Sequence, residues 1–84
     1  MIETSELVDA ILAAIEGAKV DIVSRQNDGL HFDAVVISSH FEGKSPIERH
    51  RMVLGPLKDL FSSRLHALSV KTWTPEEWER KGNV

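Results

Sequence analysis

Two proline-containing capping boxes fix where two helices of this 84-residue chain begin. The segments Ser45-Pro46-Ile47-Glu48 and Thr74-Pro75-Glu76-Glu77 each place a hydroxyl residue at the cap, proline at the first helical position and glutamate at the third. Proline loses no hydrogen bond at that position, and the hydroxyl and carboxylate groups satisfy two otherwise unpaired backbone amides. The sequence therefore predicts one helix from Pro46 and a short terminal helix from Pro75 that carries Trp78 and packs it against the rest of the domain.

The helix from Pro46 carries an apolar stripe at three- and four-residue spacing, made by His50, Val53, Leu54, Leu57, Leu60 and Phe61. We interpret His50 as a buried histidine bonded to a backbone carbonyl, with Arg49 and Arg51 flanking the buried face. Pro56 removes one backbone donor and crowds the preceding turn. The sequence therefore predicts a kink or a two-helix break at Gly55-Pro56.

Hydrophobic spacing assigns the remaining elements. Apolar residues recur every three or four positions from Leu7 to Ile15, which predicts a helix that Thr4 or Ser5 caps and Gly17 ends. Polar–apolar alternation predicts a hairpin with a turn at residues 26–29, a first strand that begins at residue 19 and a second strand over residues 30–38. A third strand is predicted over residues 66–73, and the apolar run 35–37 indicates that the second strand is central.

This order predicts an α+β fold in one domain, residues 1–84, with two layers: helices against one face of a three-stranded mixed sheet. The hairpin makes strands one and two antiparallel, whereas the helical crossover makes strands two and three parallel. His31 begins the second strand and His66 begins the third. We therefore expect both imidazoles at one end of the sheet.

Composition narrows the classes of function. The chain has no cysteine, which excludes disulfides and thiolate metal sites formed by this chain alone. It has no apolar run of about 20 residues and no export signal at its start, so we expect a cytoplasmic protein that does not enter membranes. No serine lies in a G-x-S-x-G elbow, and no glycine-rich phosphate loop is present, so we expect no enzyme.

The segments FEGKSPIERHRMVLGPL and RLHALSVKTWTPEEW resemble the BolA family, whose pattern has an Arg-His-Arg run, His-Ala near a strand start and Thr-Pro-x-x-Trp. The match covers residues 32–78, and Gly55-Pro56-Leu57 looks most like the IbaG-like branch. The resemblance implies a type II KH-like domain of order αββ(α)αβα. It also implies partnership with a monothiol glutaredoxin and a [2Fe–2S] cluster to which the BolA-like protein supplies histidine.

Within this resemblance, His66 matches the family's C-terminal cluster ligand. The family's second ligand is a His or Cys in the loop between strands one and two; residues 25–29 contain neither. His31 is then the available side chain, or it occupies the neighbouring family position. A glutaredoxin cysteine and glutathione would hold one iron and imidazole the other, so we expect no cluster in the isolated protein.

A nucleic-acid-binding regulator is the alternative class. The first 42 residues hold two bases and eight acids, whereas residues 44–71 hold six bases and two acids. This surplus suggests Lys44, Arg49, Arg51 and Lys58 as weak phosphate contacts, although a solvated helix surface is the preferred explanation for so few charges. The KH clamp needs a G-x-x-G loop, and the corresponding residues 55–58 lack the second glycine. We therefore expect weak, salt-dependent DNA binding at most.

Overall fold

The computed structural model describes residues 3–24, 31–58 and 67–82. The elements are α1 (Thr4–Ala14), β1 (Lys19–Ser24), β2 (His31–Ile37), the 3-10 turn η1 (Ser39–Phe41), α2 (Pro46–Leu54), the 3-10 turn η2 (Gly55–Leu57), β3 (Ala67–Trp73) and α4 (Pro75–Gly82). The predicted order of helices and strands is confirmed. The predicted hairpin turn at residues 26–29 lies outside the described residues.

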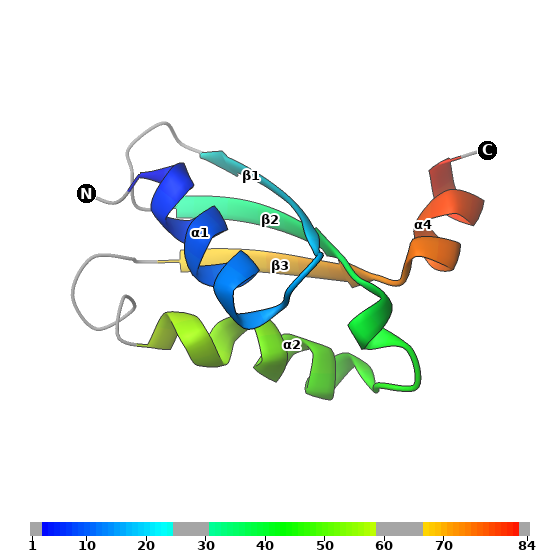
Figure 1. Ribbon diagram of the computed structural model, residues 1–84. Coiled ribbons are helices and arrows are strands. Elements are labelled where there is room, and N and C mark those ends of the chain that lie inside the picture. Colours follow the sequence, from blue (N-terminus) through cyan, green and yellow to red (C-terminus); the bar gives the residue numbers. More distant parts are fainter. Residues whose placement is uncertain (1–2, 25–30, 59–66, 83–84) are drawn as a thin grey trace.

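The three strands form one sheet in the order β1-β2-β3 (Figure 1). β1 and β2 are antiparallel, with Lys19 opposite Ile37, and β2 and β3 are parallel, with His31 opposite Ala67. A hairpin can join only antiparallel neighbours, and the long crossover through α2 returns β3 parallel to β2. The predicted mixed sheet with a central second strand is therefore confirmed.

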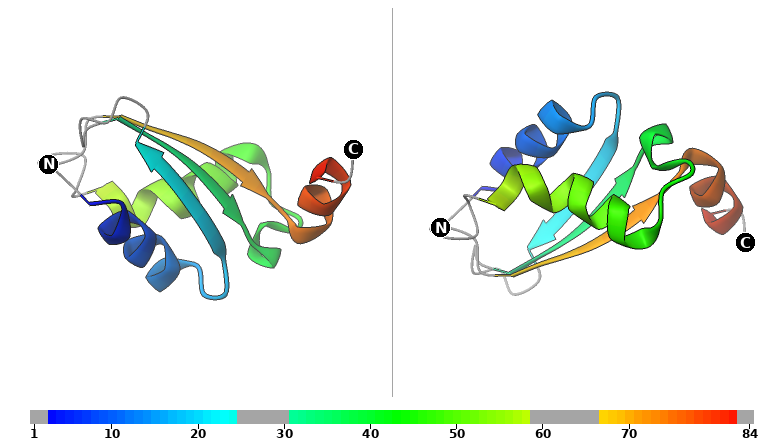
Figure 2. Two further views of the ribbon diagram at one scale, coloured as in Figure 1. Left: turned by 90° about the horizontal axis from the view of Figure 1, so that it is seen from above. Right: turned by 90° about the horizontal axis from the view of Figure 1, so that it is seen from below.

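Helices α1 and α2 cover the same face of this sheet, as the views from above and below show (Figure 2). β2 alternates strictly, and its buried residues Phe32, Ala34 and Val36 point to that face. The core is completed by Leu7, Ile11, Ile15, Phe41, Val53, Leu57 and Val70, which are all buried. The two-layer α+β architecture follows, because each amphipathic helix buries its apolar stripe on one sheet face.

Both proline capping boxes form as predicted. The Glu48 amide donates to Ser45 Oγ at 3.2 Å, and the Ser45 amide donates to Glu48 Oε1 at 3.0 Å. At α4, the Thr74 amide donates to Glu77 Oε1 at 2.9 Å and the Glu77 amide to Thr74 Oγ1 at 3.1 Å. Two backbone amides at each helix start are thereby satisfied.

The start of α1 differs from the prediction. Glu3, rather than Thr4 or Ser5, is the N-cap residue, and its amide donates to Glu6 Oε1 at 3.4 Å. The Glu6 carboxylate thus accepts the amide of the cap residue, which is the role of the third-position glutamate in a capping box. Leu12, which the apolar spacing placed on the buried stripe, is 36% exposed.

The predicted break in the long helix lies at the expected place. α2 ends at Leu54, and Gly55–Leu57 form a 3-10 turn that keeps right-handed helical angles at Gly55. The chain direction is therefore preserved across Pro56, and Leu57 remains fully buried with Val53.

Among the described residues, no helix is long and apolar enough to cross a membrane.

Candidate functional site

Of the two histidines predicted as metal ligands, the structure describes His31. His31 is the first residue of β2, and it lies opposite Ala67, the first residue of β3. Phe32 points into the core, so alternation turns His31, which is half-buried, toward the opposite face of the sheet. His66 precedes Ala67 in the chain but lies outside the described residues. The ligand role of both histidines stays a prediction.

The residues that the structure describes do not form a complete metal site. Among the residues that the structure describes, no three His, Asp or Glu side chains lie close enough to hold a metal ion together. The whole chain has no cysteine to supply thiolate ligands. Imidazole nitrogen can complete a cluster whose sulfur ligands come from elsewhere, as in sites with mixed His and Cys ligation.

The prediction that His50 is buried on the α2 stripe is wrong, because the side chain is exposed. The inner face of α2 and η2 is formed instead by Arg49, Val53 and Leu57, which are spaced four residues apart. His50 follows Arg49 by one residue, about 100° around the helix. The helix is thus rotated relative to the predicted stripe, since the arginine lies on the inner face and the histidine does not.

Arg49 lies on the inner face because its guanidinium has partners there. Nη1 and Nη2 donate to the two carboxylate oxygens of Glu77 at 2.8 and 3.3 Å, and Nε donates to the Lys44 carbonyl at 3.1 Å. The guanidinium carbon also lies 5.9 Å from the centre of the Phe41 ring. The Arg49 side chain is 14% exposed. Arg49 therefore joins α2 to α4 and is engaged within the fold.

The same contact changes the acidity of Glu77. The Arg49 hydrogen bond, with a second from the Thr74 amide, lowers the pKa of the Glu77 carboxyl from 4.5 to about 2. The capping motif predicted Glu77 as a capping residue, but no motif predicted its ion pair with Arg49. No spacing rule connects two residues that lie 28 positions apart, so this contact had no local signal.

The other basic candidates differ from Arg49. Lys44, Arg51 and Lys58 are exposed, and the last two lie on the outer side of α2 and η2. They remain available to an anionic partner in a way that Arg49 is not. Their role as phosphate contacts stays a prediction.

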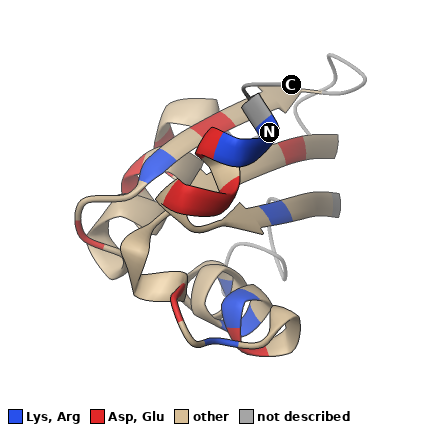
Figure 3. Cartoon of the chain, turned by 90° about the vertical axis from the view of Figure 1, so that its right-hand side faces the viewer, with Lys and Arg blue, Asp and Glu red and all other residues tan. Residues whose placement is uncertain are grey.

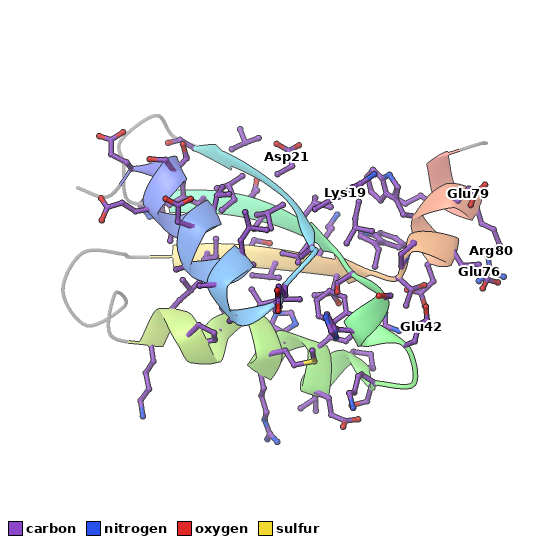
Figure 4. The ribbon with its side chains drawn as sticks, viewed as in Figure 1. Lys19, Asp21, Glu42, Glu76, Glu79 and Arg80 are labelled. Atoms are coloured by element: carbon purple, nitrogen blue, oxygen red, sulfur yellow. The ribbon has the colours of Figure 1, made fainter. Side chains whose placement is uncertain are left out.

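Helix α4 closes the end of the sheet where β3 finishes. It carries acidic residues in its first turn and basic residues in its last turn (Figure 3), the arrangement that a helix dipole favours. Glu76 and Arg80 meet at 3.8 Å on its outer side (Figure 4), but both side chains are more than 70% exposed and add little stability.

The aromatic contacts of α4 are partly open to solvent. The rings of Trp73 and Trp78 meet edge to face with centroids 6.0 Å apart, and the Lys81 ammonium lies 5.3 Å from the Trp73 ring centre. Trp78 is 39% exposed. Trp78 therefore packs against Trp73, as predicted for this residue, while part of its side chain faces solvent.

Comparison with known proteins agrees with this fold. The family model described as BolA-like protein matches residues 10–77. The acid stress protein IbaG of Escherichia coli K12 is 32% identical over 79 residues, which cover 93% of this chain and 90% of that protein. The DNA-binding transcriptional regulator BolA of Vibrio cholerae is 32% identical over 77 residues, which cover 92% of this chain and 72% of that one.

A solved structure extends the likeness to three dimensions. A bolA protein homologue from Coxiella burnetii superposes with a TM-score of 0.81 and 38% identity, covering 95% of this chain and all of that one. The family model covers the chain from the second half of α1 to the start of α4. The chain therefore belongs to the BolA family.

Proposed function

We propose that this protein is a cytoplasmic adaptor that binds a monothiol glutaredoxin and supplies histidine ligation to a shared [2Fe–2S] cluster. Its role would lie in iron–sulfur assembly, cluster trafficking or iron and redox signalling. The observation that carries the proposal is the pairing of His31 with Ala67, which brings the start of β2 beside the residue that follows His66. His31 is thus opposite the residue that directly follows His66 in the chain.

The ligand chemistry of the chain supports a complex rather than an independent cluster carrier. The chain has no thiol, and two histidines alone bind iron weakly. In the proposed complex His66 would ligate one iron, with His31 as the second candidate on this chain. Thiolates of the glutaredoxin and of glutathione would hold the other iron. Replacing sulfur by nitrogen raises the reduction potential of such a cluster.

The test mixes the purified protein with cluster-loaded monothiol glutaredoxin and follows visible absorption and circular dichroism. We expect a new spectrum that His66→Ala abolishes and His31→Ala weakens. His40→Ala is the matched control, because His40 is exposed and follows the opposite end of β2. An unaltered spectrum with His66→Ala would overturn the ligand assignment.

The pH dependence supplies a second readout of the same complex. Imidazole binds metal in its neutral form, so the spectrum should weaken as the pH falls through the ordinary histidine range near about 6.5. A spectrum of constant amplitude through this range, with glutaredoxin alone also unchanged, contradicts histidine ligation.

A nucleic-acid-binding regulator is the second candidate, and the name of the Vibrio cholerae relative favours it. On this chain the exposed cations Lys44, Arg51 and Lys58 would contact phosphate, whereas Arg49 is held by Glu77. So few contacts support weak binding that is lost as salt rises. Tight, sequence-selective binding of a DNA duplex at physiological salt would reverse the order of the two candidates.

A further inference from the structure

A shallow apolar groove follows the outer side of α2, away from the sheet. It is lined by Pro46, Ile47, His50, Arg51, Leu54, Gly55 and Lys58. Ile47 is 64% exposed, more than Leu12, Val23 or Trp78 among the exposed large hydrophobic residues described. The opposite side of the same helix supplies Val53 to the core, and Leu54 is the groove residue that also packs against the core.

Charge and apolar side chains alternate along this groove. Ile47, Arg51, Leu54 and Lys58 follow one another at spacings of four, three and four residues, so they form one stripe along the helix. From residue 46 to residue 58 the helix rises about 18 Å, which is the length of a helix of about 12 residues. The acid beside this stripe, Glu48, accepts the Ser45 amide in the helix cap. The groove therefore presents a basic, apolar surface.

We propose that this groove binds an acidic amphipathic helix of a partner protein. Apolar side chains of that helix would pack on Ile47 and Leu54, while its carboxylates would pair with Arg51 and Lys58. Helices that recognise grooves use apolar anchors three, four and seven residues apart, and the spacing here is complementary to that pattern. Because the surface is small, the affinity belongs to the weak, transient class of complexes.

The composition of the groove favours a protein helix over nucleic acid. A phosphate backbone gains affinity from each cation that it meets, and the stripe offers two arginine or lysine side chains over about 18 Å. Apart from His50, its remaining lining is apolar, which suits leucine-like side chains and offers phosphate oxygens few donors. Arg49, the next basic residue of α2, is turned inward toward Glu77.

The test uses the whole protein, without cluster, and a synthetic probe helix. The probe is a peptide of roughly 14 residues with leucines on one face and glutamates beside them, and a twin carries lysine for glutamate. Calorimetry should show that the acidic peptide binds with a Kd on the order of 100 μM and that the lysine twin binds at least about tenfold more weakly. Ile47→Asp and Arg51→Glu should each weaken binding of the acidic peptide by about tenfold or more.

Two substitutions elsewhere are matched controls. Val23→Asp alters a valine on β1 that is 58% exposed, and Arg80→Glu reverses an arginine on α4 whose side chain is 71% exposed. Both should leave the peptide affinity unchanged, and circular dichroism should show that all four variants remain folded.

Several results would overturn the proposal. Equal binding of the two peptides would do so, as would tighter binding of a DNA duplex that Arg51→Glu abolishes. Sedimentation equilibrium showing that Ile47→Asp breaks a dimer of this chain would assign the groove to a second copy instead. The measurement needs no cluster and no glutaredoxin, so its failure leaves the proposed adaptor function untouched.

Discussion

Trp78 is the aromatic anchor of α4, and its replacement by alanine measures how firmly this helix is held. Its ring meets the Trp73 ring edge to face at 6.0 Å, and 39% of the residue is exposed. A fully buried tryptophan loses about 3–5 kcal/mol on truncation to alanine. Because roughly three-fifths of Trp78 is buried, we expect Trp78→Ala to lower the free energy of unfolding by about 2–3 kcal/mol.

Urea unfolding followed by far-ultraviolet circular dichroism gives this free energy without relying on the deleted indole. For a domain of this size the loss corresponds to a melting temperature lower by about 10–20 °C. Trp78→Phe is the matched control, since a smaller ring can still meet Trp73. We expect it to cost about 1 kcal/mol, less than half the cost of alanine.

The result can contradict the reasoning in either direction. A loss below about 0.5 kcal/mol would show that α4 contributes almost nothing through this contact. A loss above about 4 kcal/mol would show that the indole is buried more completely than its exposed fraction indicates. Equal losses for Trp78→Ala and Trp78→Phe would also contradict the prediction, because the edge-to-face contact with Trp73 would then add no stability.

The remaining predictions concern the Arg49–Glu77 ion pair, one loop glycine and the inner face of α2. Because the pKa of Glu77 is lowered from 4.5 to about 2, its stabilising effect is complete above pH 4.5 and is lost as the pH falls toward 2. The melting temperatures of wild type and Glu77→Gln should converge over that range; a constant difference would contradict the ion pair. Gly43 has φ +75° with open space around it, so Gly43→Ala should cost about 1 kcal/mol in a chemical melt and Gly43→Asn less. Leu57→Ala should cost about 3 kcal/mol in the same assay, whereas Ile47→Ala on the exposed side should cost under about 0.5, and similar costs would contradict the assigned helix orientation.

Local signals in the sequence were sufficient for the elements and their order. The capping boxes at Ser45 and Thr74 act within four residues, so their geometry does not depend on distant contacts. Strict alternation in β2 likewise gave the buried face, because a strand turns each successive side chain to the other side. Topology then followed from the hairpin and the crossover, which allow one arrangement of neighbours.

The orientation of α2 could not be predicted in the same way. Periodicity favoured His50 on the inner face because Val53, Leu54 and Leu57 follow it at offsets of three, four and seven residues. The partner is Glu77, which reaches Arg49 from another helix and is invisible to any short-range rule. A polar residue on the inner face of a helix is thus decided by tertiary contacts, and an error of one residue rotates the face by about 100°.

The candidate site was predictable to the extent that it depends on topology. Parallel strands begin at the same end of a sheet, so His31 and His66 were expected at one end, and the register places His31 opposite Ala67, the residue after His66. The apolar groove was not predicted, although Ile47 and Leu54 are apolar residues seven positions apart on the predicted helix. Leu54 was predicted on the buried stripe, whereas it is half-buried and also lines the groove.

The two proposed surfaces lie on connected parts of the molecule, and one experiment can separate them. In Figure 1, α2 runs toward the end of the sheet where β2 and β3 begin. Lys58, the last residue of the groove lining, follows η2, and His31 is the first residue of β2. A glutaredoxin that also used the groove would lose affinity with Arg51→Glu while its complex kept the same visible spectrum. His66→Ala should do the reverse, changing the spectrum and leaving the binding of the acidic peptide intact. If Arg51→Glu leaves glutaredoxin affinity unchanged but still weakens the peptide, the groove serves a different partner from the cluster, and the chain has two independent binding surfaces.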